Sequence, residues 1–205
     1  MSRTVICPSA LDAVAGIVDG ATVLVGGFGM AGMPTVLIDA LIAQGATDLT
    51  IVSNNAGNGD HGLAALLAAG RVAKVVPQGN LAERIRAAGA GIGAFFCPTG
   101  VGTPLAEGKE TRTIDGRDYV LEYPIYGDVA LIGAHIADRA GNLLYRKTAR
   151  NFGPVMATAA QLTVAEVSRV VDTGDLDPEN IVTPGIFVDR ILDLSVADQQ
   201  KERAS

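Results

Sequence analysis

Side chains that could act as nucleophiles, general bases or metal ligands are few in this sequence. Neither histidine, His61 or His135, has a cysteine or carboxylate at metal-ligand spacing, and His135 follows an apolar strand, which favours a structural role. No serine lies in a nucleophile-elbow motif, and Cys97 has no candidate base near it in sequence. Glu166 ends an apolar strand and could be a carboxylate nucleophile, but we interpret it as a salt-bridged surface acid. The sequence therefore predicts no metal site and no marked nucleophile.

One loop, in contrast, has a clear ligand-binding pattern. A short apolar strand over residues 22–25 runs into a stretch with four glycines, and helical spacing of apolar residues begins at Thr35, directly after Pro34. A strand, a glycine loop and a helix in this order bring bare backbone N–H groups to an anionic ligand at the helix N-terminus. We expect the ligand to contact Gly26, Gly27, Phe28, Gly29, Met30, Ala31 and Gly32.

Two other interpretations of this loop stay open. Residues 27–32 satisfy the dinucleotide pattern G-x-G-x-x-G, but the next strand ends in Ser53-Asn54-Asn55, without the carboxylate that would bind a ribose. That absence argues against a nicotinamide or flavin site. Alternatively, the glycines only allow the helix and strand to pack closely. If the loop binds ligand, we expect valine at Gly29 or Gly32 to damage binding without unfolding the protein.

Polar side chains follow two further predicted strands. The strand over 49–52 leads to Asn54 and Asn55, and the strand over 72–76 leads to Gln78. In open parallel sheets, ligands bind at the carboxyl ends of the strands. We therefore expect Asn54, Asn55 and Gln78 to line one site with the glycine loop.

The remaining pattern predicts one α/β domain over residues 1–198, with a mainly parallel open sheet flanked by helices, and a disordered tail over 199–205. Residues 146–152 form the one local cluster of positive charge, which we interpret as a solvated face. Further expected elements are a helix over 10–17 capped by Ser9, helices over 62–69 and 81–88, a loop over 89–102, a hairpin over 111–122 turning at Asp115-Gly116, and strands over 129–132 and 162–167.

Composition excludes several classes of partner. The 205 residues carry a net charge of -6 and only 4% aromatic side chains, with no tryptophan, which argues against nucleic acid and anionic membranes. No apolar run is long enough to span a bilayer, and the N-terminus lacks the apolar core of a signal peptide. The two cysteines, Cys7 and Cys97, have no partner motif, as expected for a cytoplasmic protein.

Five ordered motifs across nearly the whole chain resemble family I coenzyme A transferases, specifically the A (alpha) subunit of the 3-oxoacid type. The motifs are Val25 to Pro34, Ser53 to Gly57, Pro77 to Arg86, Ala149 to Phe152 and Ile181 to Gly185. Three stretches, Gly29 to Pro34, Asn58-Gly59 and Lys109 to Arg112, are most similar to the branch that acts on 3-oxoadipate.

The resemblance implies a mechanism shared between two subunits. The nucleophile would be a glutamate of the B (beta) subunit, which forms an acyl anhydride and then a glutamyl-CoA thioester in a ping-pong reaction. Succinyl-CoA would be the donor and 3-oxoadipate the acceptor, with acetoacetate as the alternative. Residues 26–32 would contact coenzyme A, a cosubstrate rather than a permanent cofactor. The amides of Asn54, Asn55 and Gln78 would face the substrate and the developing oxyanion.

Two questions stay open at this stage. A non-catalytic α/β domain that binds a nucleotide or sugar phosphate would show a similar glycine loop, and no motif indicates whether the subunits form a heterodimer or a heterotetramer.

The chain also departs from the family pattern after Lys74, where about two dozen residues are expected before Val75. A true deletion and a missing loop both fit, and the intact flanking motifs favour the missing loop. In that case, two half-strands are fused at Lys74.

Overall fold

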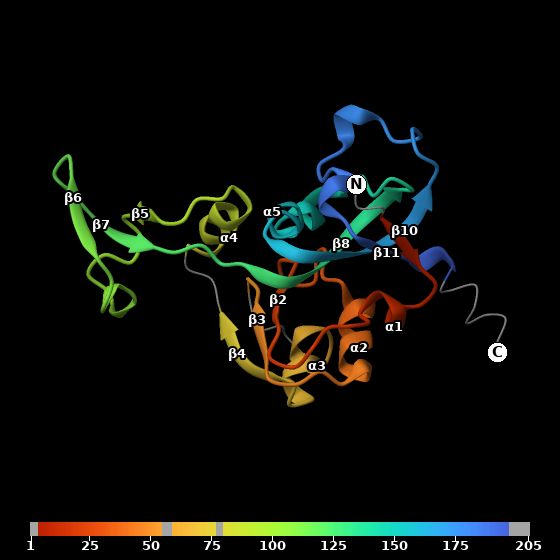
Figure 1. Cartoon of the computed structure of the whole chain (residues 1–205), viewed down its shortest axis with the longest axis horizontal. Helices are drawn as coiled ribbons and strands as arrows, with labels where there is room; N and C mark the ends of the chain where they lie inside the picture. Colours follow the sequence, from red (N-terminus) through yellow and green to blue (C-terminus); the bar gives the residue numbers. More distant parts are fainter. Residues whose placement is uncertain (1–3, 55–58, 77–79, 197–205) are drawn as a thin grey trace.

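Seven parallel strands form the central sheet in a computed structural model that describes residues 4–54, 59–76 and 80–196 (Figure 1). Their order across the sheet is β1-β11-β10-β8-β2-β3-β4, and the short β9 pairs antiparallel with β8. The strands span Val5–Cys7 (β1), Thr22–Val25 (β2), Leu49–Val52 (β3), Val72–Val76 (β4), Gly127–Asp138 (β8), Leu143–Leu144 (β9), Ala160–Val171 (β10) and Arg190–Asp193 (β11).

Helices cover both faces of this sheet (Figure 1). The helices α1 (Ala10–Ala13), α2 (Thr35–Gln44) and α3 (Leu63–Ala68) pack on one face, and α4 (Leu81–Gly89) and α5 (Gly153–Ala157) pack on the other. Alternate residues of β2 supply the two cores, because successive side chains of a strand point to opposite faces. Val23 and Val25 join the core under α2, while Leu24 joins the core under α4. The predicted α/β class with a mainly parallel sheet is confirmed.

A second, antiparallel sheet projects from the main body (Figure 1). It contains β5 (Phe95–Cys97), β6 (Thr111–Ile114) and β7 (Arg117–Glu122). The predicted hairpin is confirmed, and both turn residues, Asp115 and Gly116, have positive φ, as a type I′ turn requires. The buried carboxylate of Glu122 fixes this sheet to the body, accepting a hydrogen bond from Lys109 Nζ at 2.9 Å and lying 3.7 Å from Arg84 Nε of α4.

The first helix is shorter than predicted. Ser9 does cap it, accepting a hydrogen bond from the Asp12 N–H, but the helix ends at Ala13 instead of residue 17. Gly16 adopts a left-handed φ of 85°, and Arg190 Nη1 binds the carbonyl oxygens of Ala13 and Ala15 at 3.0 and 2.7 Å. These contacts satisfy the carbonyls that a longer helix would have used.

Several strands also differ from those predicted from the sequence. The strand predicted over 129–132 is part of the twelve-residue β8, because β8 pairs with β10 along almost its whole length. β5 lies inside the segment 89–102, which we expected to be a loop. β4 runs unbroken through Lys74 and Val75, with a register irregularity against β3 between Leu49 and Thr50. The predicted tail at 199–205 lies outside the described residues.

Candidate functional site

The glycine loop, Gly26 to Gly32, follows β2 at the carboxyl end of the sheet. Its first N–H, that of Gly26, donates to Leu131 O of β8 at 2.9 Å. The loop then closes on itself, with Phe28 and Ala31 exchanging two backbone hydrogen bonds at 3.0 and 3.2 Å. The side chains of Phe28 and Met30 are 61% and 56% exposed. The loop is therefore a tight turn with an apolar tip that protrudes from the fold.

The glycines of this loop do two different jobs. Gly32 has a φ of 74°, and a Cβ there would collide with the carbonyl oxygen of Ala149. On its other side, a Cβ at Gly133 of β8 would lie 2.7 Å from Gly32 O. Gly29, with a φ of 60°, has no atom within 4 Å of its Cβ position. Close packing thus explains Gly32, whereas only the tip around Gly29 is open to a ligand.

We predict that alanine at these two positions separates packing from binding. Gly32→Ala should cost on the order of 2–4 kcal/mol of folding stability, because the backbone of Ala149 cannot yield to the new methyl group and the left-handed φ of 74° adds strain. Gly29→Ala should cost only about 1 kcal/mol, the strain of its left-handed backbone. This corrects our expectation that a side chain at either glycine would spare the fold. Urea unfolding of both variants measures the difference, and equal stabilities would contradict it.

The side chain of Asn151 fixes the glycine loop to the rest of the protein. Its Oδ1 accepts hydrogen bonds from the N–H groups of Gly27 at 3.1 Å and Phe152 at 2.6 Å. Its Nδ2 donates to Ala31 O at 2.9 Å and Thr148 O at 2.7 Å. The amide thereby uses all its donors and acceptors on backbone groups. Asn151 joins both ends of the loop tip to the turn that precedes α5.

That turn carries the positive cluster found in the sequence. It consists of residues 146–150 around the 3-10 helix η2 (Lys147–Arg150), and we call it the basic turn. We interpreted the cluster as a solvated face, and its cations are indeed exposed. The structure adds that the turn packs against the glycine loop through Ala149, and that the next residue, Asn151, hydrogen-bonds to the loop.

Asn54 lies at the same end of the sheet as the glycine loop. The preceding residue, Ser53, is buried, and its hydroxyl donates to Val25 O at 3.1 Å, which ties the end of β3 to the end of β2. Asn54 itself is half-buried. Asn55 and Gln78 fall outside the described residues, so their predicted roles remain predictions.

Glu166 differs from the surface acid that we expected. It is only 8% exposed, and its Oε2 accepts a hydrogen bond from the Leu37 N–H at 3.0 Å. The N-cap of α2, Pro34, offers no side-chain hydrogen bond, so a carboxylate from β10 caps this helix instead. Burial raises the pKa of Glu166 to about 7, although the bonds from Leu37 and Val36 lower it. The interpretation of Glu166 as a surface acid was wrong. The sequence around Glu166 could not show that the N-terminus of α2, a distant element, packs against this residue.

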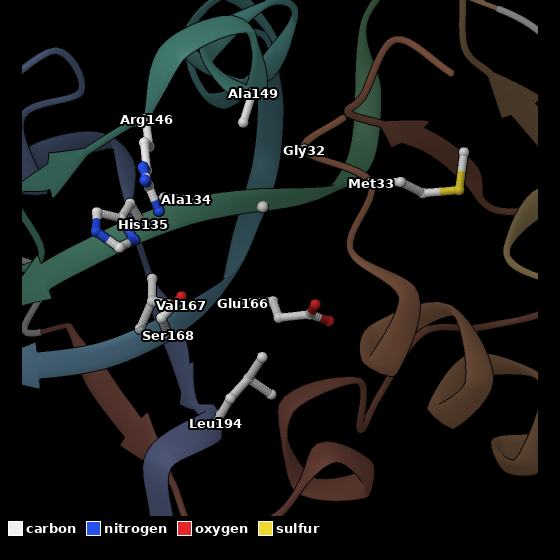
Figure 2. Close-up of a pocket in the computed structure, with 11 residues that line it drawn as sticks. Gly32, Met33, Ala134, His135, Arg146, Ala149, Glu166, Val167, Ser168 and Leu194 are labelled. Atoms are coloured by element: carbon white, nitrogen blue, oxygen red, sulfur yellow. The ribbon is translucent and has the colours of Figure 1, made fainter. Parts of the chain in front are cut away.

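A cavity of about 210 Å³ lies beside Glu166, between β8, β10 and the basic turn (Figure 2). His135 and Arg146 lie together on one side of it, and the Glu166 carboxylate points away from them toward α2 (Figure 2).

His135 is half-buried and has no hydrogen bond to a described side chain, so the structure does not show the satisfied structural histidine that we expected. His61 is exposed, 2.9 Å from the Asp60 carboxylate. Within the described ranges, no three histidine, cysteine, aspartate or glutamate side chains lie together in a way that could hold a metal ion.

The raised pKa of Glu166 predicts a pH-dependent stability. The folded protein binds this proton more tightly than the unfolded chain, whose carboxyl has its usual pKa of 4.5. The protonated carboxyl therefore adds stability that is complete below pH 4.5 and is lost as the pH rises through about 7. A shift of this size corresponds to at most about 3 kcal/mol.

Glu166→Gln tests this, because glutamine keeps an acceptor for the Leu37 N–H and does not titrate. Urea unfolding at pH values from about 5 to 8 should show that the wild type loses more stability with rising pH than the variant does. The exposed Glu107→Gln serves as the matched control and should follow the wild type. Parallel curves for the wild type and Glu166→Gln would contradict the assignment.

Comparison with known proteins shows the family of this chain. The sequence profile of the family described as coenzyme A transferase matches residues 8–77 and 73–194, and the chain therefore belongs to the coenzyme A transferase family. Within that family, it is similar to chains named as A or alpha subunits. It is 61% identical to the A subunit of 3-oxoadipate CoA-transferase from Pseudomonas putida, over 92% of this chain and 93% of the relative. It is 43% identical to the alpha subunit of acetate CoA-transferase from Escherichia coli, over 88% and 93% of the two chains.

Solved structures share the fold. The acyl-CoA transferase YdiF of E. coli O157:H7, in a thioester complex with CoA, superposes with a TM-score of 0.80 at 23% identity, over 94% of this chain. The chain spans only about half of YdiF, 47% of its length. A variant of the decarboxylase AibA/AibB gives a TM-score of 0.78 at 28% identity, over 94% of this chain and 84% of that one.

The alignments also bear on the missing segment after Lys74. The two profile matches overlap at residues 73–77, on either side of the Lys74–Val75 junction. The alignment with the P. putida relative spans 215 positions, more than the 205 residues of this chain. The relative therefore has positions to which no residue of this chain corresponds.

No helix in the described part of the chain has the length and apolar character that a membrane span requires.

Proposed function

We propose that this chain is the A subunit of a heteromeric transferase that moves CoA from succinyl-CoA to 3-oxoadipate. The 61% identity to the A subunit of the P. putida 3-oxoadipate CoA-transferase, over nearly the full length of both chains, carries the proposal. The corresponding A subunit from Acinetobacter baylyi is 56% identical. The A subunit of a probable succinyl-CoA:3-ketoacid coenzyme A transferase from Bacillus subtilis is 48% identical, which supports a succinyl-CoA donor and keeps acetoacetate as the alternative acceptor.

The B subunit supplies the nucleophile in this proposal. Its glutamate attacks the thioester carbonyl of succinyl-CoA and forms an acyl anhydride, and the released CoA thiolate then attacks the anhydride to give a glutamyl-CoA thioester. Succinate leaves, and the second acid collects the CoA by the reverse steps. In this chain, the buried carboxylate of Glu166 is engaged by the N–H of Leu37 and points away from His135 and Arg146 (Figure 2). A partner's glutamate is therefore the better nucleophile.

This chain contributes binding and charge stabilisation. The open tip of the glycine loop offers backbone close to the acyl-CoA, and Asn54 at the end of β3 offers an amide. Asn55 and Gln78 would add two more. Amides suit this role because they donate hydrogen bonds to a developing oxyanion and carry no charge that could neutralise a neighbouring glutamate. CoA is then a cosubstrate, and the proposal requires no permanent cofactor. The two free cysteines, Cys7 and Cys97, accord with a cytoplasmic enzyme.

Reconstitution tests the proposal. The purified chain alone should transfer no CoA from succinyl-CoA, whereas a mixture with the B subunit should be active. The kcat/KM for 3-oxoadipate should exceed that for acetoacetate. A higher value for acetoacetate would reassign the acceptor, and full activity of the chain alone would overturn the two-subunit mechanism. Binding of a nucleotide or sugar phosphate by the chain alone, without any transfer activity in the mixture, would favour a non-catalytic domain.

A further inference from the structure

We propose that the space between the glycine loop and the basic turn is a subsite for an anionic group of the substrates, and that Arg150 recognises the charge. The inference rests on the proposed function, because it assigns part of a substrate of that enzyme to a particular cavity. It goes beyond that function by giving a role to the basic turn, which the glycine-loop motif alone does not explain.

A cavity of about 540 Å³ lies at this junction, lined by Phe28, Ala31, Thr148, Arg150 and Asn151. Its volume falls within the range of small-molecule sites in proteins. The glycine loop contributes the exposed Phe28 and Ala31 to the lining, and the basic turn contributes Thr148 and Arg150. The cavity therefore fits a ligand with an apolar body and a polar end.

The polar groups in the cavity define the chemistry of that end. The amide of Asn151 is saturated by four backbone partners and has nothing left to offer a ligand. The remaining polar side chains in the lining are the hydroxyl of Thr148 and the guanidinium of Arg150. Arg150 has no ion pair and no side-chain hydrogen bond with the described residues. A guanidinium binds carboxylate or phosphate through two parallel hydrogen bonds. The guanidinium of Arg150 could therefore bind an anionic group of a ligand.

The walls of the cavity are fixed relative to each other before any ligand arrives. Asn151 joins the glycine loop to the basic turn, and Gly32 packs against the backbone of Ala149 with no room for a side chain. Lys147 adopts a φ of 51°, a left-handed conformation that non-glycine residues reach only at a cost. A rigid site loses less entropy on binding than a mobile one. Arg150 is thus presented from a preformed turn.

Two kinds of group in the proposed substrates have the required charge. Coenzyme A carries phosphates on its nucleotide end, and both 3-oxoadipate and the succinyl group carry a non-reacting carboxylate that acetoacetate lacks. Both would bind a guanidinium in the same way, and substrates that lack one or the other group distinguish them.

The test uses the reconstituted complex with its B subunit. Arg150→Met removes the charge but keeps an unbranched side chain, and Arg150→Lys keeps a charge without the planar fork. Arg169→Met is the matched control, because Arg169 is also an exposed arginine without an ion pair to a described residue, and it does not line the cavity. KM and kcat are measured with succinyl-CoA, succinyl-pantetheine, 3-oxoadipate and acetoacetate.

We expect Arg150→Met to raise KM by about tenfold to a hundredfold for the substrates that carry the bound group, the usual loss for a hydrogen bond to a charged group. Arg150→Lys should recover part of it, and Arg169→Met should behave as wild type. If the bound group is phosphate, the rise appears with succinyl-CoA and is absent with succinyl-pantetheine. If it is the carboxylate, the rise appears with 3-oxoadipate and with both succinyl thioesters, and is absent with acetoacetate.

Unchanged KM values for all four substrates would overturn the subsite. Failure of Arg150→Met to assemble with the B subunit in size-exclusion chromatography would also overturn it and make the turn a subunit contact. If the wild-type complex transfers no CoA, the proposed function fails on its own. Calorimetric titration of that complex and the Arg150 variants with free CoA and with 3-oxoadipate then decides the subsite: weaker binding by Arg150→Met supports it, and equal binding rejects it.

Discussion

Asn151→Leu is expected to release the glycine loop and lower kcat/KM for succinyl-CoA by on the order of a hundredfold in the reconstituted enzyme. Leucine has a similar size but leaves the N–H groups of Gly27 and Phe152 and the carbonyls of Ala31 and Thr148 without their partner. Removing partners from partly buried backbone groups should cost on the order of 2–4 kcal/mol in stability. The loss of activity should appear mainly in KM, because the loop binds the acyl-CoA before reaction in the proposed mechanism.

Asn151→Asp is the informative companion. An aspartate keeps both accepted hydrogen bonds and loses the two donated ones, so it should retain part of the activity that leucine removes. Thermal unfolding and steady-state kinetics are measured for both variants. A merely structural role would lower the melting temperature and leave KM unchanged in the folded protein. That outcome would show that the position of the loop does not matter for CoA.

Gln78→Ala is expected to lower turnover by on the order of a hundredfold or more, with a smaller effect on substrate binding. An amide directed at charge that develops during acyl transfer contributes most in the transition state. The prediction rests on the family match and on the position of Gln78 after β4, since Gln78 itself lies outside the described residues.

The competing interpretation is that Gln78 only helps to begin the helix at Leu81. A lost cap lowers thermal stability modestly and leaves the chemistry intact. Single-turnover transfer in the complex, measured together with a melting curve, separates the two. Normal transfer with an earlier melting transition would leave only the capping role. Asn54→Ala is a useful parallel variant, because Asn54 is described, half-buried and close to the end of β2 through its neighbour Ser53.

Local patterns predicted the elements around the site well. The strands over 22–25, 49–52 and 72–76 were predicted with their observed bounds, because each is a short apolar run that ends in glycine or polar residues. The stop of α2 at Gly45, with φ 99°, follows from the need for a left-handed residue at the helix end.

Long-range partners could not be predicted in the same way. Asn151 is 124 residues from Gly27, and Glu166 is 129 residues from Leu37. Each of these side chains forms hydrogen bonds with backbone groups of a distant element, and the residues around it in sequence do not indicate which element that is. A signal was present in both cases: an amide directly after the basic turn, and a carboxylate inside an otherwise apolar strand. Both break the local pattern, and such breaks mark residues with partners elsewhere in the fold.

Gly29 and Gly32 also show that a local sequence pattern does not reveal long-range packing. The sequence pattern led to one interpretation for Gly29 and Gly32, because both belong to one glycine-rich motif. In the fold, Gly32 is enclosed between Gly133 and Ala149, while Gly29 is open. The distinction depends on β8 and the basic turn, which lie about a hundred residues further along the chain.

The location of the covalent intermediate tests the central claim most directly. The reconstituted complex is incubated with succinyl-CoA in the absence of acceptor, and both subunits are then studied by intact-protein and peptide mass spectrometry. We predict a CoA thioester on a glutamate of the B subunit, with none on this chain, and the same result when this chain carries Glu166→Gln. A CoA adduct on this chain, above all on Glu166, would contradict the account.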